Sequence, residues 1–91
     1  MYKYSPEKNL KLIQERNISF EEIVEAIESG YLLEIIEHHN KTKYQHQKMY
    51  VVQVDDYVYC VPFVKDGDED VLLKTIFPSR KAKRKFYKKD N

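Results

Sequence analysis

Apolar residues in the first third of the chain recur every three or four positions, a pattern that predicts two short helices. Residues 5–7 (Ser-Pro-Glu) form a helix-start signal, because serine caps a helix, proline suits its first turn and glutamate favours its positive end. Leu10 and Ile13 then fall on one face. We expect this helix to fade near residues 16–17.

The second helix is predicted to begin at Ser19, which can form a capping box with Glu22. Apolar residues from Phe20 to Ile27 follow at helical spacing. Gly30 stands where a helix C-terminal cap belongs, so the helix is expected to end just before it.

Beyond Gly30 four segments are rich in leucine, β-branched or aromatic residues, as is typical of strands. These segments are residues 31–37, 49–54, 57–64 and 71–77. The first of them could also extend the preceding helix, and we favour a strand. They are joined by a loop over 38–47, a hairpin turn at residues 55–56 and an acidic turn over 65–70. Pro78 stops the last strand, and Ser79 can cap a closing helix.

These elements predict a single α+β domain over residues 1–91. The short connections between strands favour antiparallel pairing. We therefore expect two N-terminal helices, an antiparallel sheet of three or four strands and a C-terminal helix, with the helices packed against the sheet.

Charge is spread unevenly along this predicted domain, although the net charge is only +1. Residues 1–40 hold four basic and eight acidic side chains, whereas residues 41–91 hold twelve basic and seven acidic ones. Such asymmetry predicts one face suited to a polyanion and another suited to a basic or neutral partner.

Several other classes of site are disfavoured by the sequence. The single cysteine, Cys60, cannot form an intramolecular disulfide and lies in an apolar run typical of a buried thiol. The histidines have no ligands at metal-binding spacing, and the two glycines form no phosphate loop. We expect no metal and no cofactor, and the polar N-terminus predicts a cytoplasmic protein without membrane association.

The strongest chemical signal is the basic segment over residues 77–89, which contains no acidic side chain. On a helical wheel Ala82 and Phe86 share one face, while Arg80, Arg84 and Tyr87 project together from nearly the opposite side. Arginine's planar fork matches phosphate oxygens, and a phenol can stack on a base. The pattern is also typical of a solvated basic helix, and both interpretations stay open.

Other cations could join this helix in a groove of the kind that binds single-stranded RNA. Lys74 lies on the predicted strand that leads into this helix, and Lys48 stands at the opening of the strand over 49–54. The loop between the first two strands adds Lys41, Lys43, Tyr44 and His46.

Two segments, S-P-E-K-N-L-K-L-I-Q-E-R-N-I-S-F-E-E-I and K-T-I-F-P-S-R-K-A-K-R-K-F-Y, resemble the two ends of BrnT-family toxins. The resemblance implies a RelE-like fold and an endoribonuclease toxin of a type II toxin–antitoxin pair, which blocks translation. It also implies two partners: a cognate protein antitoxin, and RNA in the form of mRNA, free or on the ribosome.

The resemblance also implies roles for individual residues. Arg80 and Lys81 match the family's Arg-x pair after the last strand, and Ala82 matches its small packing residue. Tyr87 matches the terminal tyrosine, and Lys74 takes the place of a strand arginine. Two features depart from the family pattern: the last helix has no glutamate, and the central E-R-[FY] motif reads Q-K-M over residues 47–49.

The implied chemistry is metal-free attack of a ribose 2′-hydroxyl on the adjacent phosphate, which needs cations, a base and an acid. The candidate catalytic residues are Arg80, Lys74, Lys81, Tyr87, Lys48 and His38. The candidate RNA-binding residues are Arg84, Lys43, Tyr44 and Lys83. An alternative interpretation is a non-catalytic module that binds RNA or an acidic protein, and the missing glutamate favours it.

Overall fold

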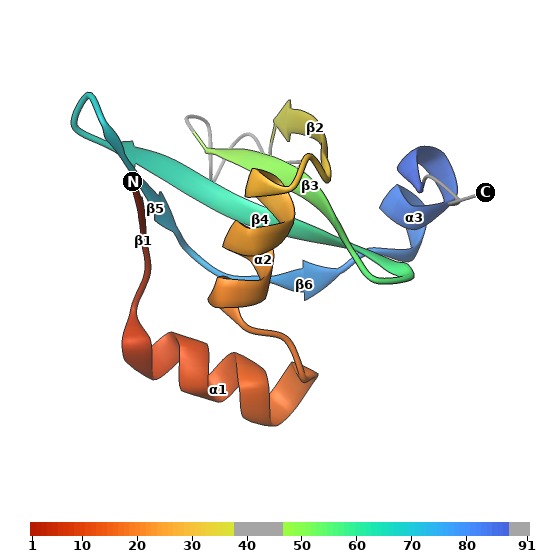
Figure 1. Ribbon diagram of the computed structural model, residues 1–91, viewed down its shortest axis with the longest axis horizontal. Helices are drawn as coiled ribbons and strands as arrows, with labels where there is room; N and C mark the ends of the chain where they lie inside the picture. The colour runs from red at the N-terminus through yellow and green to blue at the C-terminus, as the bar shows by residue number, and fades with distance from the viewer. Residues whose placement is uncertain (38–46, 88–91) are drawn as a thin grey trace.

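The computed structural model describes residues 1–37 and 47–87, which form three helices and six strands (Figure 1). The N-terminal elements are β1 (Tyr2–Lys3), α1 (Pro6–Arg16) and α2 (Phe20–Glu28). The remaining elements are β2 (Leu32–Glu37), β3 (Lys48–Val54), β4 (Tyr57–Asp66), β5 (Asp70–Leu73), β6 (Phe77–Pro78) and α3 (Arg80–Phe86). The three predicted helices are confirmed, and each of the four predicted strand segments contains a strand.

The predicted helix boundaries follow from the caps. The Ser5 hydroxyl accepts a hydrogen bond from the Lys8 backbone N–H at 3.2 Å, and Ser19 and Glu22 form the reciprocal capping box. Gly30 has φ +94°, a left-handed conformation that glycine adopts without strain, and it follows the last turn of α2.

The sheet corrects the prediction of an antiparallel, RelE-like arrangement of three or four strands. Its order is β1-β5-β4-β3-β2, with β6 paired to β4, and β1 pairs with β5 in parallel. The sheet is therefore mixed and has six strands. The predicted strand over 71–77 is split into β5 and β6, and both parts lie along the same strand, β4.

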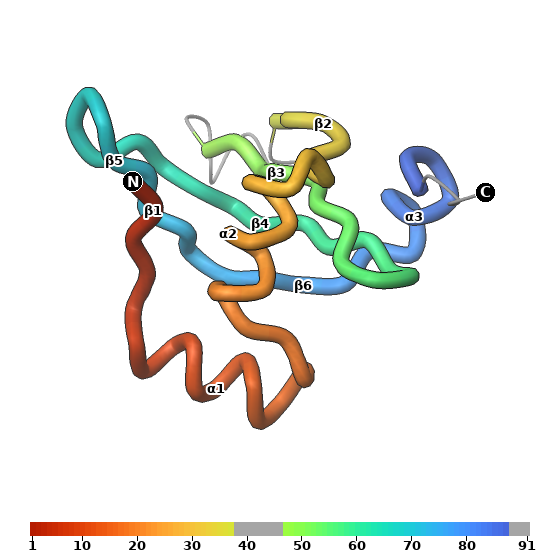
Figure 2. Tube along the Cα trace, in the orientation of Figure 1, coloured from red at the N-terminus to blue at the C-terminus, as the bar shows by residue number. Residues whose placement is uncertain are grey.

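β1 has only two residues, so no apolar period could reveal it in the sequence. It lies beside the β4–β5 hairpin, whose residues are distant from it in the chain (Figure 2). The N-terminal ammonium donates to the Glu69 carbonyl at 2.7 Å, and the Lys3 ammonium lies 3.1 Å from a carboxylate oxygen of Asp70. A backbone hydrogen bond from the Val71 N–H to the Met1 carbonyl at 2.9 Å accompanies these contacts.

The two faces of the sheet are covered by different helices. Along β3, Tyr50 and Val52 point into the larger cluster, which includes residues of α1 and α2. Met49 and Val51 point into a smaller cluster on the other face, together with Ala82 of α3. This alternation is the two-residue period of a strand that is buried on both sides.

The face that α1 turns toward the core is not the one that carries Leu10 and Ile13. Leu10 and Ile13 are 61% and 42% exposed, whereas Asn9 and Leu12 are buried. Asn9 Nδ2 donates to Glu21 Oε1 at 2.7 Å, and Asn9 Oδ1 accepts from the Phe20 backbone N–H at 2.7 Å. This buried amide joins the two helices and lies on the face of α1 that meets the core, together with Leu12.

α1 is the longest of the described helices, with eleven residues. A helix that crosses a bilayer needs about 20 predominantly apolar residues. Within residues 1–37 and 47–87, therefore, no helix meets the requirements of length and apolar character for spanning a membrane.

Candidate nucleic-acid interface

The basic helix α3 is fixed to the sheet by the segment that precedes it. Ser79 N–H donates to the Val58 carbonyl at 3.1 Å, and the Ser79 hydroxyl accepts from the Ala82 N–H at 3.1 Å. The Ala82 side chain, only 6% exposed, then packs into the smaller cluster. A strand contact, a serine cap and a small packing residue together set the position of α3.

Five of the seven residues of α3 are basic and none is acidic. The basic residues are Arg80, Lys81, Lys83, Arg84 and Lys85, of which all but Lys83 are exposed. In the part of the chain that the structure describes, no carboxylate forms an ion pair with any of them. These charges are therefore available to a polyanion.

Lys83 is held between two phenol rings. Its ammonium nitrogen lies 4.7 Å from the centre of the Tyr57 ring and 5.3 Å from the centre of the Tyr87 ring. Both distances allow cation–π attraction. The Tyr57 and Tyr59 rings are adjacent, with centroids 5.7 Å apart. The contact therefore joins α3 to the β3–β4 hairpin and puts aromatic rings beside the basic helix.

Tyr57 was not among the predicted site residues. It begins a strand with no basic neighbour in the sequence, and only the packing of α3 against the hairpin brings it to Lys83. The only feature of the sequence that could have indicated a role for Tyr57 was its position directly after the predicted hairpin turn.

Tyr87 does not project with Arg80 and Arg84, so that prediction was wrong. Its ring packs against the smaller cluster, beside Phe86. The helical wheel treats residue 87 as part of the helix, whereas α3 ends at Phe86 and Tyr87 has an extended ψ of 128°. Tyr87 thus belongs to the side of α3 that anchors it.

The other predicted residues are divided by the sheet. Lys74 is exposed between β5 and β6, on the edge of the sheet that leads into α3. Lys48 is paired with Phe63 and has the same strand parity as Tyr50, so it faces the side of α1 and α2. The structure therefore separates Lys48 from α3.

The predicted site residues of the loop between β2 and β3 lie outside the described residues. They are His38, Lys43 and Tyr44, with the accompanying Lys41 and His46.

Cys60 lies beneath α3, in the smaller cluster. Burial raises the pKa of its thiol, opposed in part by a hydrogen bond with Ser79. A nucleophilic thiolate is disfavoured there, as the sequence predicts. Across residues 1–37 and 47–87, no three histidine, cysteine or acidic side chains are grouped in a way that could hold a metal ion.

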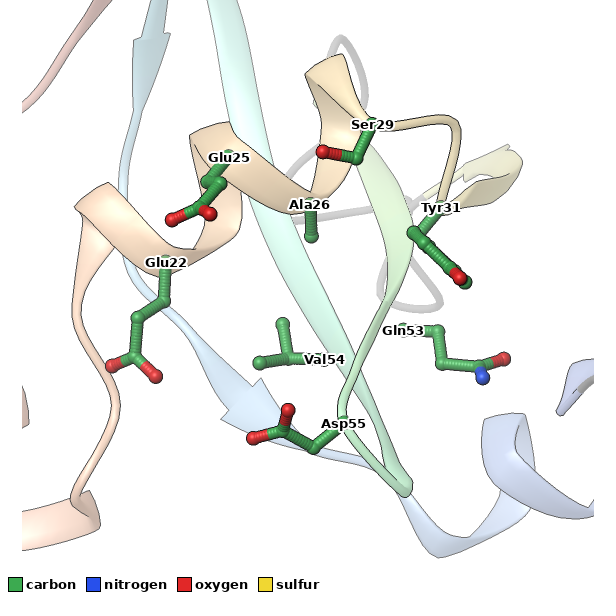
Figure 3. Close-up of a pocket in the computed structure, with 8 residues that line it drawn as sticks. All are labelled: Glu22, Glu25, Ala26, Ser29, Tyr31, Gln53, Val54 and Asp55. Atoms are coloured by element: carbon green, nitrogen blue, oxygen red, sulfur yellow. The ribbon is translucent and has the colours of Figure 1, made fainter. Parts of the chain in front are cut away.

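A second surface feature is a depression of about 360 Å³ between α2 and the end of β3, here called the acidic depression (Figure 3). It is lined by Glu22, Glu25, Ala26, Ser29, Tyr31, Gln53, Val54 and Asp55. Figure 3 shows the three carboxylates on one side of the hollow, with Tyr31 and Gln53 on the other. These carboxylates repel phosphate, so a nucleic acid is expected at α3 rather than here.

Residues 10–78 match the model of a family described as a domain of unknown function, DUF4258. The match extends from α1 to β6 and stops two residues before α3. Neither the curated proteins nor the solved structures contain a match to this chain. The basic helix therefore lies outside the part of the chain that identifies the family.

Proposed function

The chain belongs to the DUF4258 family, whose function is unknown, and we propose that it is an endoribonuclease toxin that binds RNA along α3. The observation that supports this proposal is the set of five basic residues on α3, none of them paired with a described carboxylate. Phosphate contacts of this kind supply most of the affinity of a protein for a nucleic acid.

RNA that is locally single-stranded suits this surface better than a duplex. Tyr57 places an aromatic ring next to the cations, and unpaired bases stack on such rings. α3 has only seven residues, and its N-terminal end is fixed to the sheet through Ser79. It therefore offers a short contact for a bent strand rather than a long helix for a groove.

The proposed reaction needs no cofactor. The 2′-oxygen attacks the adjacent phosphorus, the bond from phosphorus to the 5′-oxygen breaks, and the products are a 2′,3′-cyclic phosphate and a free 5′-hydroxyl. Arg80 contacts the phosphate and stabilises the charge that develops on its oxygens. Lys81 or Lys74 protonates the leaving 5′-oxygen, while solvent takes up the proton of the 2′-hydroxyl.

The assignment to a toxin–antitoxin system is supported by the resemblance of the two ends of the chain to BrnT-family toxins. A toxin of this class acts on mRNA and is neutralised by a cognate protein antitoxin. The support comes from those two segments and from the exposed cations of α3, not from the architecture of the sheet.

The test is incubation of the purified protein with a defined mRNA, with and without ribosomes, followed by mapping of the new 5′ ends. We expect fragments with 5′-hydroxyl ends, and we expect Arg80→Ala to abolish them. Lys48→Ala is the matched control, because it removes one charge from the opposite face of the sheet. RNA that stays intact under both conditions would refute the proposed cleavage.

A second candidate is a non-catalytic RNA-binding module. It is favoured by one observation: α3 has no carboxylate to act as a base, since its only non-basic residues are Ala82 and Phe86. The same incubation separates the two candidates, because the module would bind RNA at α3 and release no fragments.

A further inference from the structure

β2 forms one edge of the sheet. Its inner side pairs with β3, and no strand among the described residues pairs with its outer side. Its sequence, L-L-E-I-I-E, contains neither the lysine nor the proline that usually protects an exposed edge. Ile35, near its middle, is 47% exposed.

The backbone at Ile35 is directed outward. Gln53 N–H donates to the Tyr31 carbonyl, which places the hydrogen-bonded positions of β3 at 53, 51 and 49. Ile35 lies opposite Tyr50, between two of those positions, so its N–H points away from β3. This N–H donates instead to Glu34 Oε1 at 3.1 Å. The carboxylate of the preceding residue thus occupies the donor that a further strand would use.

The charge along this edge is uneven: on the α1 and α2 face Ile35 shares a hollow with Lys48 and Lys65, whereas the start of the edge is acidic. The acidic depression begins at Tyr31, the residue that directly precedes β2 (Figure 3). Glu22, Glu25 and Asp55 lie there, and none of them forms an ion pair with a described cation. A chain that runs along β2 and past its start would therefore meet carboxylates.

We propose that the outer edge of β2 binds an extended segment of a protein partner that alternates basic and apolar residues. The backbone of the partner accepts the Ile35 N–H and displaces the Glu34 carboxylate, which then pairs with a basic side chain of the partner. Further basic side chains lie over the acidic depression. This surface is separate from α3 and does not depend on the proposed cleavage of RNA.

A second copy of the chain fits this edge less well. Antiparallel pairing of two β2 strands with Ile35 opposite Ile35 places the two Glu34 side chains on one face, in diagonal positions. Like charges at such positions are unfavourable, whereas a lysine or arginine in the partner strand is favourable.

The test uses a short fluorescein-labelled peptide that alternates lysine with valine, titrated with the whole protein and followed by fluorescence anisotropy. We expect saturable binding that weakens with salt, and loss of about tenfold in affinity for Ile35→Pro, which removes the outward N–H. Ile35→Val keeps both the N–H and an apolar side chain and is expected to bind normally. A peptide with glutamate in place of lysine should not bind.

Hydrogen exchange of the Ile35 amide in the native protein provides a readout if Ile35→Pro does not fold. We expect the lysine–valine peptide to slow this exchange and to leave that of α3 unchanged. Three results would overturn the proposal: unchanged binding to folded Ile35→Pro, equal binding of the glutamate peptide, or unchanged exchange at Ile35. A dimer of the chain alone that Ile35→Pro dissociates would assign the edge to a second copy instead. RNA binding and cleavage are measured separately, so their failure or success would leave this result as it stands.

Discussion

The dependence of RNA affinity on salt provides a quantitative test of the role of α3. Each phosphate neutralised on a single strand contributes about −0.7 to the slope of log K against log salt concentration. If all five basic residues of α3 contact phosphates, the slope is about −3.5. Replacing Arg80 and Arg84, both exposed, with glutamine should change it to about −2.1 and lower the affinity about 25-fold at 0.1 M salt.

The matched control is the double variant Lys48→Gln with Lys65→Gln. It removes the same net charge, but both side chains lie on the face of the sheet opposite α3. Its salt slope should equal that of the unmodified protein. The assay is fluorescence anisotropy with a labelled single-stranded RNA at several salt concentrations. If the control lowers the slope as much as the arginine variant, the affinity reflects net charge and α3 is not a defined interface.

Three further predictions concern the structure that supports this interface. Asn9→Ala should lower the free energy of unfolding in urea by about 2 kcal/mol, because it leaves the fully buried Phe20 N–H without an acceptor; a loss below about 0.5 kcal/mol would contradict this role. The hydrogen bond from Asn9 is also the main cause that lowers the pKa of Glu21 below its ordinary 4.5. The ionised Glu21 carboxylate therefore stabilises the folded protein at pH values above the pKa of Glu21 in the unfolded chain. This contribution is lost as the pH falls through the lower pKa of Glu21 in the folded protein. Asn9→Ala should therefore destabilise the protein more at pH 7 than at pH 3, and equal losses at both would refute the link. The Cys60 thiol of the native protein should react with iodoacetamide far more slowly than that of the urea-unfolded chain. Ala82→Glu should increase the rate in the native protein by displacing α3. Equal rates for the unmodified protein and Ala82→Glu would refute the idea that α3 shields Cys60.

Local signals in the sequence predicted the elements well. The serine caps, the capping box and the hairpin turn involve residues within three positions of one another, so their chemistry can be read from short segments. The three helices and the strands from β2 to β5 follow from these signals and from the apolar period.

Contacts between distant segments were not predictable in the same way. β1 pairs with a strand about seventy residues later, through charges that have no pattern along the chain. The buried face of α1 could not be read from the apolar spacing, because Asn9, a polar residue, takes a core position and Leu10 is exposed. Apolar spacing alone favours the opposite orientation.

The candidate site shows the same division. The basic residues of α3 could be recognised from the sequence, since they are adjacent in it. The tyrosine that contacts Lys83 and the separation of Lys48 depend on which face of the sheet each strand residue takes. The hairpin turn at residues 55–56 fixes the register of β3 against β4, but it does not specify which face of the hairpin α3 covers.

The unequal size of the two clusters has a consequence for motion. α3 rests on the smaller cluster, of which Ala82 is its one buried member, whereas α2 contributes Phe20 and Ile23 to the larger one. To leave the sheet, α3 has to expose Ala82 and the partly buried rings of Phe86 and Tyr87, but no large side chain that is fully buried. It should therefore open in a local fluctuation that leaves the rest of the fold intact. Its amides should therefore exchange with solvent before those of β3 and β4. A ligand bound across α3 and the β3–β4 hairpin would suppress this opening, so its binding energy would stabilise the attachment of α3 to the sheet.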